Sequence, residues 1–130
     1  MATLLEIIDK VEAEFSTDKD RYYVYGMSMS GYGTWDIVAR YPDRFAAALP
    51  ICGGGPRDAG EALKDIPIWT VHSDDDPTIS VEGTREMVSV IKSAGGTQIH
   101  YTEVTGRGHK MGVFTASDSA LFEWLFSQHK

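Results

Sequence analysis

The sequence predicts an α/β fold in which one parallel sheet is covered by helices on both faces. Short runs rich in β-branched and aromatic residues alternate along the chain with longer segments of helical hydrophobic spacing. A helix-like segment between successive strands is the pattern of parallel crossover connections. The strand-like runs are largely apolar, as expected of a sheet that is buried on both faces.

Four segments have the composition of strands and four the spacing of helices. The strands are expected at about residues 21–27, 46–51, 67–72 and 98–104, and the helices near 3–15, 30–41, 80–94 and 116–127. The first helix is expected to start at a capping box, Thr3-Leu4-Leu5-Glu6. It has an apolar stripe of Leu4, Ile7, Ile8, Val11 and Phe15. Pro42 and Gly95 end the second and third helices.

The length and composition predict one domain. A chain of 130 residues, 42% of them hydrophobic, is long enough to bury one core. No linker, repeat or low-complexity segment interrupts it, so we expect residues 1–130 to form a single minimal domain.

Ser28 lies in the segment Gly26-Met27-Ser28-Met29-Ser30-Gly31, between the first predicted strand and the second predicted helix. A sharp turn there raises the serine hydroxyl above the sheet and points the amino terminus of the helix at an anion formed beside it. Short turns rich in Gly and Ser are also common in purely structural roles, so the turn by itself leaves both interpretations open.

Asp76 and His109 are the candidate partners of this serine. Asp76 follows the apolar run 66–71, and His109 follows the alternating run 99–104 in the segment Gly106-Arg107-Gly108-His109. The carboxyl ends of parallel strands share one edge of a sheet, where ligand sites form. Asp74 is the alternative acid in the same loop.

These segments resemble the α/β-hydrolases, in particular the small carboxylesterase, feruloyl-esterase-like and predicted-peptidase group. The resemblance rests on residues 26–35, 40–48, 50–55, 72–77 and 106–109, and the order Ser, Asp, His is that of the superfamily. It extends over nearly the whole chain but over only the second half of a family member. It implies a truncated α/β-hydrolase of about four parallel strands, with Ser28 as nucleophile, His109 as base and Asp76 as the acid that orients the base.

The resemblance also implies that the strand before Ser28 lies at the sheet edge, because its usual neighbour is missing from this sequence. An apolar edge strand such as 22–25 offers unpaired backbone groups to another chain, so we expect a homo-oligomer formed by edge pairing. The alternative is that the first helix or a loop covers this edge.

One oxyanion donor is expected from the backbone N–H of Met29, the residue after the nucleophile. The second donor normally comes from a loop that this sequence does not contain. Tyr32, Gly53 and Gly54 are candidate substrate contacts, and the Tyr32 hydroxyl or a partner chain could replace the missing donor. Ser30 stands where the Gly-x-Ser-x-Gly pattern has its second glycine, and a Cβ must therefore be accommodated there.

No cofactor or metal is expected. His72 and His100 lie in or beside strands without a partner at ligand spacing, and the Asp74-Asp75-Asp76 run lacks the glycine and the later glutamate of a calcium loop. Cys52 is the single cysteine, which excludes an intrachain disulfide and favours simple burial.

The charge and hydropathy pattern excludes several classes of partner. Twelve Lys and Arg against 19 Asp and Glu give a net charge of -7, which disfavours nucleic acid and anionic membranes. The sequence has no signal peptide and no membrane-spanning run, so a cytoplasmic location is expected.

The sequence thus predicts a serine carboxylesterase that acts on short or accessible acyl esters. Two alternatives are a serine peptidase, which the same resemblance covers, and a catalytically silent hydrolase-like module that only dimerises or binds a partner.

Overall fold

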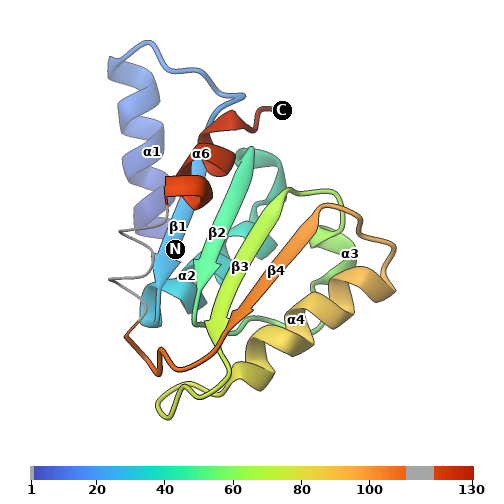
Figure 1. Cartoon of the computed structure of the whole chain (residues 1–130). Coiled ribbons are helices and arrows are strands. Elements are labelled where there is room, and N and C mark those ends of the chain that lie inside the picture. The colour runs from blue at the N-terminus through green and yellow to red at the C-terminus, as the bar shows by residue number, and fades with distance from the viewer. Residues whose placement is uncertain (1, 111–118) are drawn as a thin grey trace.

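The computed structural model describes residues 2–110 and 119–130, and its centre is a parallel sheet of four strands in the order β1-β2-β3-β4 (Figure 1). The strands are β1 (Tyr23–Met27), β2 (Ala47–Ile51), β3 (Ile68–Ser73) and β4 (Ile99–Val104). Neighbouring strands pair in parallel, with Met27 opposite Ile51, Ile51 opposite Val71 and Ser73 opposite Val104. The four predicted strands and their parallel arrangement are confirmed.

The helices are α1 (Ala2–Glu14), α2 (Met29–Arg40), α3 (Gly60–Leu63), α4 (Val81–Ser93) and α6 (Ser119–Ser127). The short helix α3 and a 3₁₀ turn at Pro42–Arg44 were not predicted, because three or four residues are too few to display a hydrophobic period. Residues 116–118, the start of the last predicted helix, lie outside the described residues.

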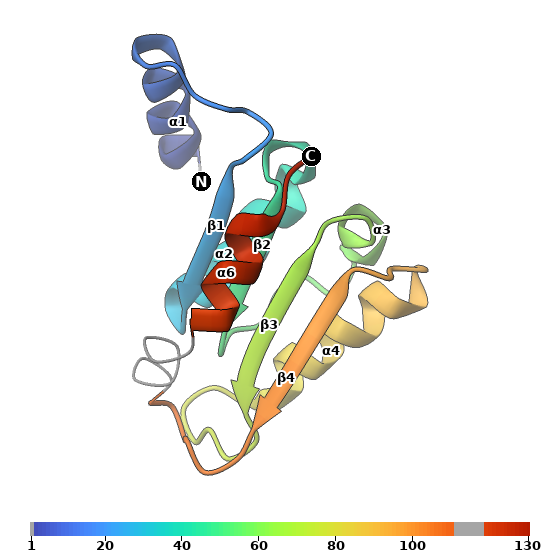
Figure 2. The same cartoon turned by 45° about the horizontal axis from the view of Figure 1, so that its top comes forward.

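Helices cover both faces of the sheet. Figures 1 and 2 show α2, α3 and α4 behind the strands and α6 in front of them. The core on the first face contains Trp35, Val38, Met87 and Ile91. On the other face Leu121 and Leu125 of α6 pack against Ala47, Leu49 and Ile51 of β2. The sheet therefore lies between two apolar layers.

Helix α1 differs from its prediction in two respects. It begins at Ala2, so Thr3 lies inside the helix and cannot be the N-cap of a capping box. Four residues of the predicted stripe, Leu4, Ile7, Val11 and Phe15, are exposed, and the contacts with the core come from Leu5 and Ile8. The described part of the chain supplies no surface that buries the rest of the stripe.

Strand β1 lies at one edge of the sheet, as predicted. Helix α1 does not shield it completely, since Tyr25 remains 59% exposed. None of the helices in the described segments combines the length and the apolar character needed to cross a membrane.

Candidate active site

Ser28 occupies a sharp turn between β1 and α2. Strand β1 ends at Met27 and α2 begins at Met29, so the whole change of direction occurs at one residue. Its φ of 59° lies in the left-handed region, and its backbone N–H is held by the carbonyl of Ile51 at 2.9 Å. A non-glycine residue in that region is strained by about 1–3 kcal/mol. The Ser28 side chain makes no helix-capping bond, which leaves the hydroxyl available at the carboxyl edge of the sheet.

Glycines make this turn possible by permitting close backbone contacts. A Cβ on Gly26 would lie 2.2 Å from the carbonyl oxygen and 2.7 Å from the Cβ of Ser30. A Cβ on Gly31 would lie 2.4 Å from the carbonyl oxygen of Ile51. The serine that replaces the second glycine of the pattern is therefore accommodated, because Gly26 leaves room for the Ser30 side chain.

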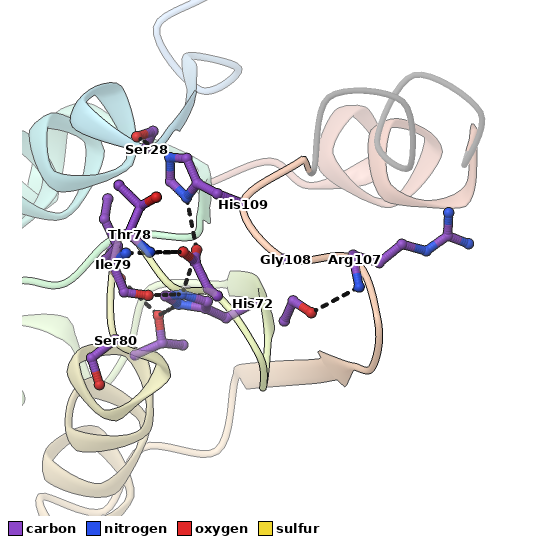
Figure 3. A network of polar contacts seen from close by, with 12 residues as sticks. Ser28, His72, Thr78, Ile79, Ser80, Arg107, Gly108 and His109 are labelled. Carbon is purple, nitrogen blue, oxygen red and sulfur yellow. Dashed lines mark hydrogen bonds and ion pairs between the residues drawn. The ribbon is translucent and has the colours of Figure 1, made fainter.

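Ser28, His109 and Asp76 form a continuous chain of polar contacts (Figure 3). The Ser28 Oγ lies 2.7 Å from His109 Nε2, and His109 Nδ1 lies 2.7 Å from Asp76 Oδ2. The Asp76 side chain has no exposed surface, whereas the His109 side chain is 26% exposed. The imidazole can thus reach both the serine and an approaching ligand, while the carboxylate that orients it is shielded from water.

The environment of Asp76 favours its ionised form. Burial by itself raises the pKa of this carboxyl group, but hydrogen bonds from His109 and from the backbone N–H groups of Ile79 and Thr78 outweigh burial and lower the pKa below its ordinary value. Both N–H groups donate to Asp76 Oδ1 at 2.9 Å. Oδ2 is thereby left to face the imidazole.

The other two acids of the 74–76 run accept hydrogen bonds from the loop that carries His109. Asp74 accepts a hydrogen bond from the Thr105 hydroxyl at 3.1 Å, and Asp75 accepts one from the backbone N–H of Gly108 at 3.0 Å. The Ser73 hydroxyl donates to Asp75 and accepts from the N–H of Arg107. Asp74, the alternative acid, therefore contacts Thr105, and Asp76 contacts His109.

These contacts were not predicted for Ser73 and Asp75. The hydrogen bond from Ser73, followed by that from Gly108, lowers the pKa of Asp75, so the ionised acceptor is also the favoured form. A serine and an acid directly after a strand are a weak signal in sequence, because such residues are common in loops.

Met29 is the first residue of α2, so its N–H is one of the helix-terminal donors that have no partner within the helix. Gly53 and Gly54 are buried, and a Cβ on Gly53 would lie 2.7 Å from the backbone nitrogen of Tyr32. The glycines thus have a packing role against the start of α2. Contact of Tyr32, Gly53 and Gly54 with substrate stays a prediction.

Cys52 is buried, as expected, but it also lies beside the site. Its φ is 42°, a rare value for a residue with a Cβ, and burial raises the pKa of its thiol. One ligand atom each from Cys52, Asp76 and His109 lies within 4.8 Å of the others, a proximity that the sequence did not predict. Asp76 and His109 bond to each other and His109 to Ser28, so two members of this group are already joined to the serine.

The two remaining candidate histidines differ in environment. His100 is exposed and packs edge-on against Trp124. His72 is buried, and its Nε2 lies 3.2 Å from Asp76 Oδ2, so it belongs to the site. In the sequence His72 and Asp76 lie in the same segment, but nothing there indicates that their side chains contact each other.

Comparison with known proteins agrees with the observed fold. No protein-family model matches the chain. A solved structure of a thermostable esterase is 39% identical and superposes with a TM-score of 0.94 over 99% of this chain and 36% of the esterase. A bifunctional acetylxylan esterase/xylanase of Neocallimastix patriciarum is 30% identical over 77 residues, which are 59% of this chain and 12% of that protein.

An acylaminoacyl peptidase of Pyrococcus horikoshii is 15% identical, with a TM-score of 0.76 over 95% of this chain and 25% of the peptidase, and shares the fold alone. The chain thus spans about a third of the esterase and a smaller share of the other two. Its fold is that of a truncated α/β-hydrolase, as the sequence predicts.

Proposed function

We propose that this chain is a serine ester hydrolase that acts on short or otherwise accessible acyl esters. The observation that carries the proposal is the uninterrupted contact from Ser28 Oγ through His109 to Asp76, with both distances at 2.7 Å. Similarity to an esterase over 99% of the chain supports the same class of reaction.

In the proposed reaction, the Ser28 oxygen attacks the ester carbonyl while its proton passes to His109 Nε2. The bond between the carbonyl carbon and the alcohol oxygen then breaks, and His109 returns the proton to the leaving alkoxide. In the second half, water attacks the acyl-serine and gives a proton to His109. The bond between the carbonyl carbon and Ser28 Oγ then breaks, His109 returns the proton to Ser28 Oγ, and the carboxylic acid leaves. Asp76 keeps the ring oriented and stabilises its charged form throughout.

The amino terminus of α2 stabilises the oxyanion. The N–H of Met29 is the donor that this chain supplies, and the helix dipole adds a partial positive charge at the same end. Loss of one donor from a two-donor site lowers the rate by about 10²–10³. Esters with good leaving groups should therefore be the preferred substrates, since they demand less stabilisation of the intermediate than amides.

The test is labelling of the purified chain by a fluorophosphonate together with hydrolysis of a p-nitrophenyl ester. Ser28→Ala should abolish both signals, because Ser28 Oγ contacts His109. Ser30→Ala should keep them, because Ser30 lies two residues further along the chain, in α2, and is exposed. His109→Ala should reduce hydrolysis to background, and Asp76→Asn should reduce it less.

The same experiment separates the alternatives. A silent module would give no labelling of the parent chain, and equal labelling of parent and Ser28→Ala would refute the site. A peptide and an ester with the same acyl group, compared on one preparation, would identify a peptidase by preferential cleavage of the amide.

A further inference from the structure

We infer that His72 is a buried, doubly protonated imidazolium that positions Asp76 and shares its carboxylate with His109. This inference rests on the proposed function for its effect on catalysis. The charge state itself follows from the hydrogen-bond partners of the ring and is independent of activity.

The first ring nitrogen, Nε2, faces only acceptors. The carbonyl oxygen of Ile79 lies 3.0 Å from it, and the ionised Asp76 Oδ2 lies at 3.2 Å (Figure 3). A carbonyl oxygen and a carboxylate have no proton to donate. Nε2 must therefore carry a proton of its own.

The second ring nitrogen, Nδ1, lies 2.8 Å from the Thr84 hydroxyl oxygen. That hydroxyl has one proton, and its other neighbour is the carbonyl oxygen of the buried Gly53, at 2.7 Å. An unpaired buried carbonyl costs about 1–3 kcal/mol, so the threonine proton belongs to Gly53. The hydroxyl oxygen then accepts from the ring, and Nδ1 also carries a proton.

A charge on a fully buried ring requires compensation. Asp76 from the same loop supplies it directly, and Glu103 lies opposite His72 in the register of β3 and β4. Arg85 of α4 faces the same region, but its guanidinium is bonded to Glu103 and Glu82. The Cys52 thiol follows β2, and a raised pKa keeps it neutral, so the carboxylates are the charges that balance the ring.

His72 and His109 share the carboxylate of Asp76. Asp76 Oδ2 faces His72 at 3.2 Å and His109 at 2.7 Å. A positive His72 neutralises part of the negative charge that would otherwise stabilise a protonated His109. Replacing His72 would leave Asp76 Oδ2 to His109 alone, so the charge on His72 should be visible in the pH dependence of the reaction.

The primary measurement is the protonation state of His72 in the parent protein, read from the ¹⁵N shifts of histidine-labelled chain. We expect both ring nitrogens of His72 to resonate as N–H at neutral pH, with assignment by loss of the signals in His72→Gln. One unprotonated ring nitrogen would overturn the inference. This measurement does not depend on activity, and it uses the variant only to assign the signals.

The second measurement is the pH dependence of fluorophosphonate labelling or ester hydrolysis. His72→Gln should move the acid limb of the profile upward by about one pH unit, the order of shift that one nearby charge produces. His100→Gln, a change of the same kind on the neighbouring strand and exposed, should leave the limb in place. A purely structural His72 would lower the rate at every pH without moving the limb, and that result would refute the positioning role.

Discussion

Gly26→Ala is the sharpest test of the turn that carries Ser28. The added Cβ would lie 2.2 Å from the carbonyl oxygen of Ser30, whereas an ordinary contact begins at about 3.4 Å. The first turn of α2 must therefore retreat by about 1.2 Å, the difference between these distances, and Ser28 is joined directly to that turn. Because the clash is with backbone, no side-chain rotation can relieve it.

A displacement of about 1 Å between reacting groups lowers a rate by about a hundredfold. We expect that loss in kcat/KM for a p-nitrophenyl ester and in the rate of fluorophosphonate labelling. Overpacking of this kind also destabilises by about 1–3 kcal/mol, which calorimetry or thermal denaturation would register as a lower Tm.

Gly83→Ala is the matched control. It adds the same methyl group to α4, where the nearest atom to the new Cβ is the Cα of Gly54 at 3.5 Å. Replacing glycine by alanine inside a helix favours folding by up to about 1 kcal/mol, so Tm should stay or rise and activity should not change. A Gly26→Ala protein with the activity and Tm of its parent would show that the turn is not the constraint deduced from its geometry.

Three further outcomes are expected. Glu103→Gln should make the free energy of unfolding less dependent on pH in the acid range. Hydrogen bonds from Arg85 and Tyr101 lower the pKa of Glu103 from 4.5 to about 2, so the stabilisation by Glu103 is complete above pH 4.5 and is lost as the pH falls towards 2. Denaturant unfolding at several pH values would measure this difference. EDTA should leave the hydrolysis rate unchanged, and a loss restored by added zinc would argue for metal chemistry instead. Sedimentation should show self-association at micromolar concentration through the β1 edge, weakened by Tyr25→Lys; a monomer of 14.3 kDa at every concentration would exclude it.

The elements with regular hydrophobic spacing could be predicted from sequence because their pattern records which faces are buried. Helix α4 is an example: Thr84, Met87, Val88 and Ile91 form its buried face and lie at helical spacing. Helix α1 has an equally regular stripe, yet most of it is exposed, since spacing describes a face and says nothing of what covers it.

In the candidate site, too, some features could be predicted from the sequence and others could not. The residues that follow strands, Ser28, Asp76 and His109, could be predicted because a parallel sheet brings its carboxyl ends together. The proximity of Cys52 to Asp76 and the contact of His72 with Asp76 could not be predicted, because they depend on the path of individual loops through the core.

The Ser28–His109 contact joins residues 81 positions apart, one after β1 and the other after β4, the two edge strands of the sheet. Every strand pairing must be in register before the two side chains meet. Reaction with a fluorophosphonate should therefore report the fully assembled molecule, and during refolding it should recover after the helices have formed, since distant pairings close late. The time course of labelling at Ser28 would then measure when folding is complete.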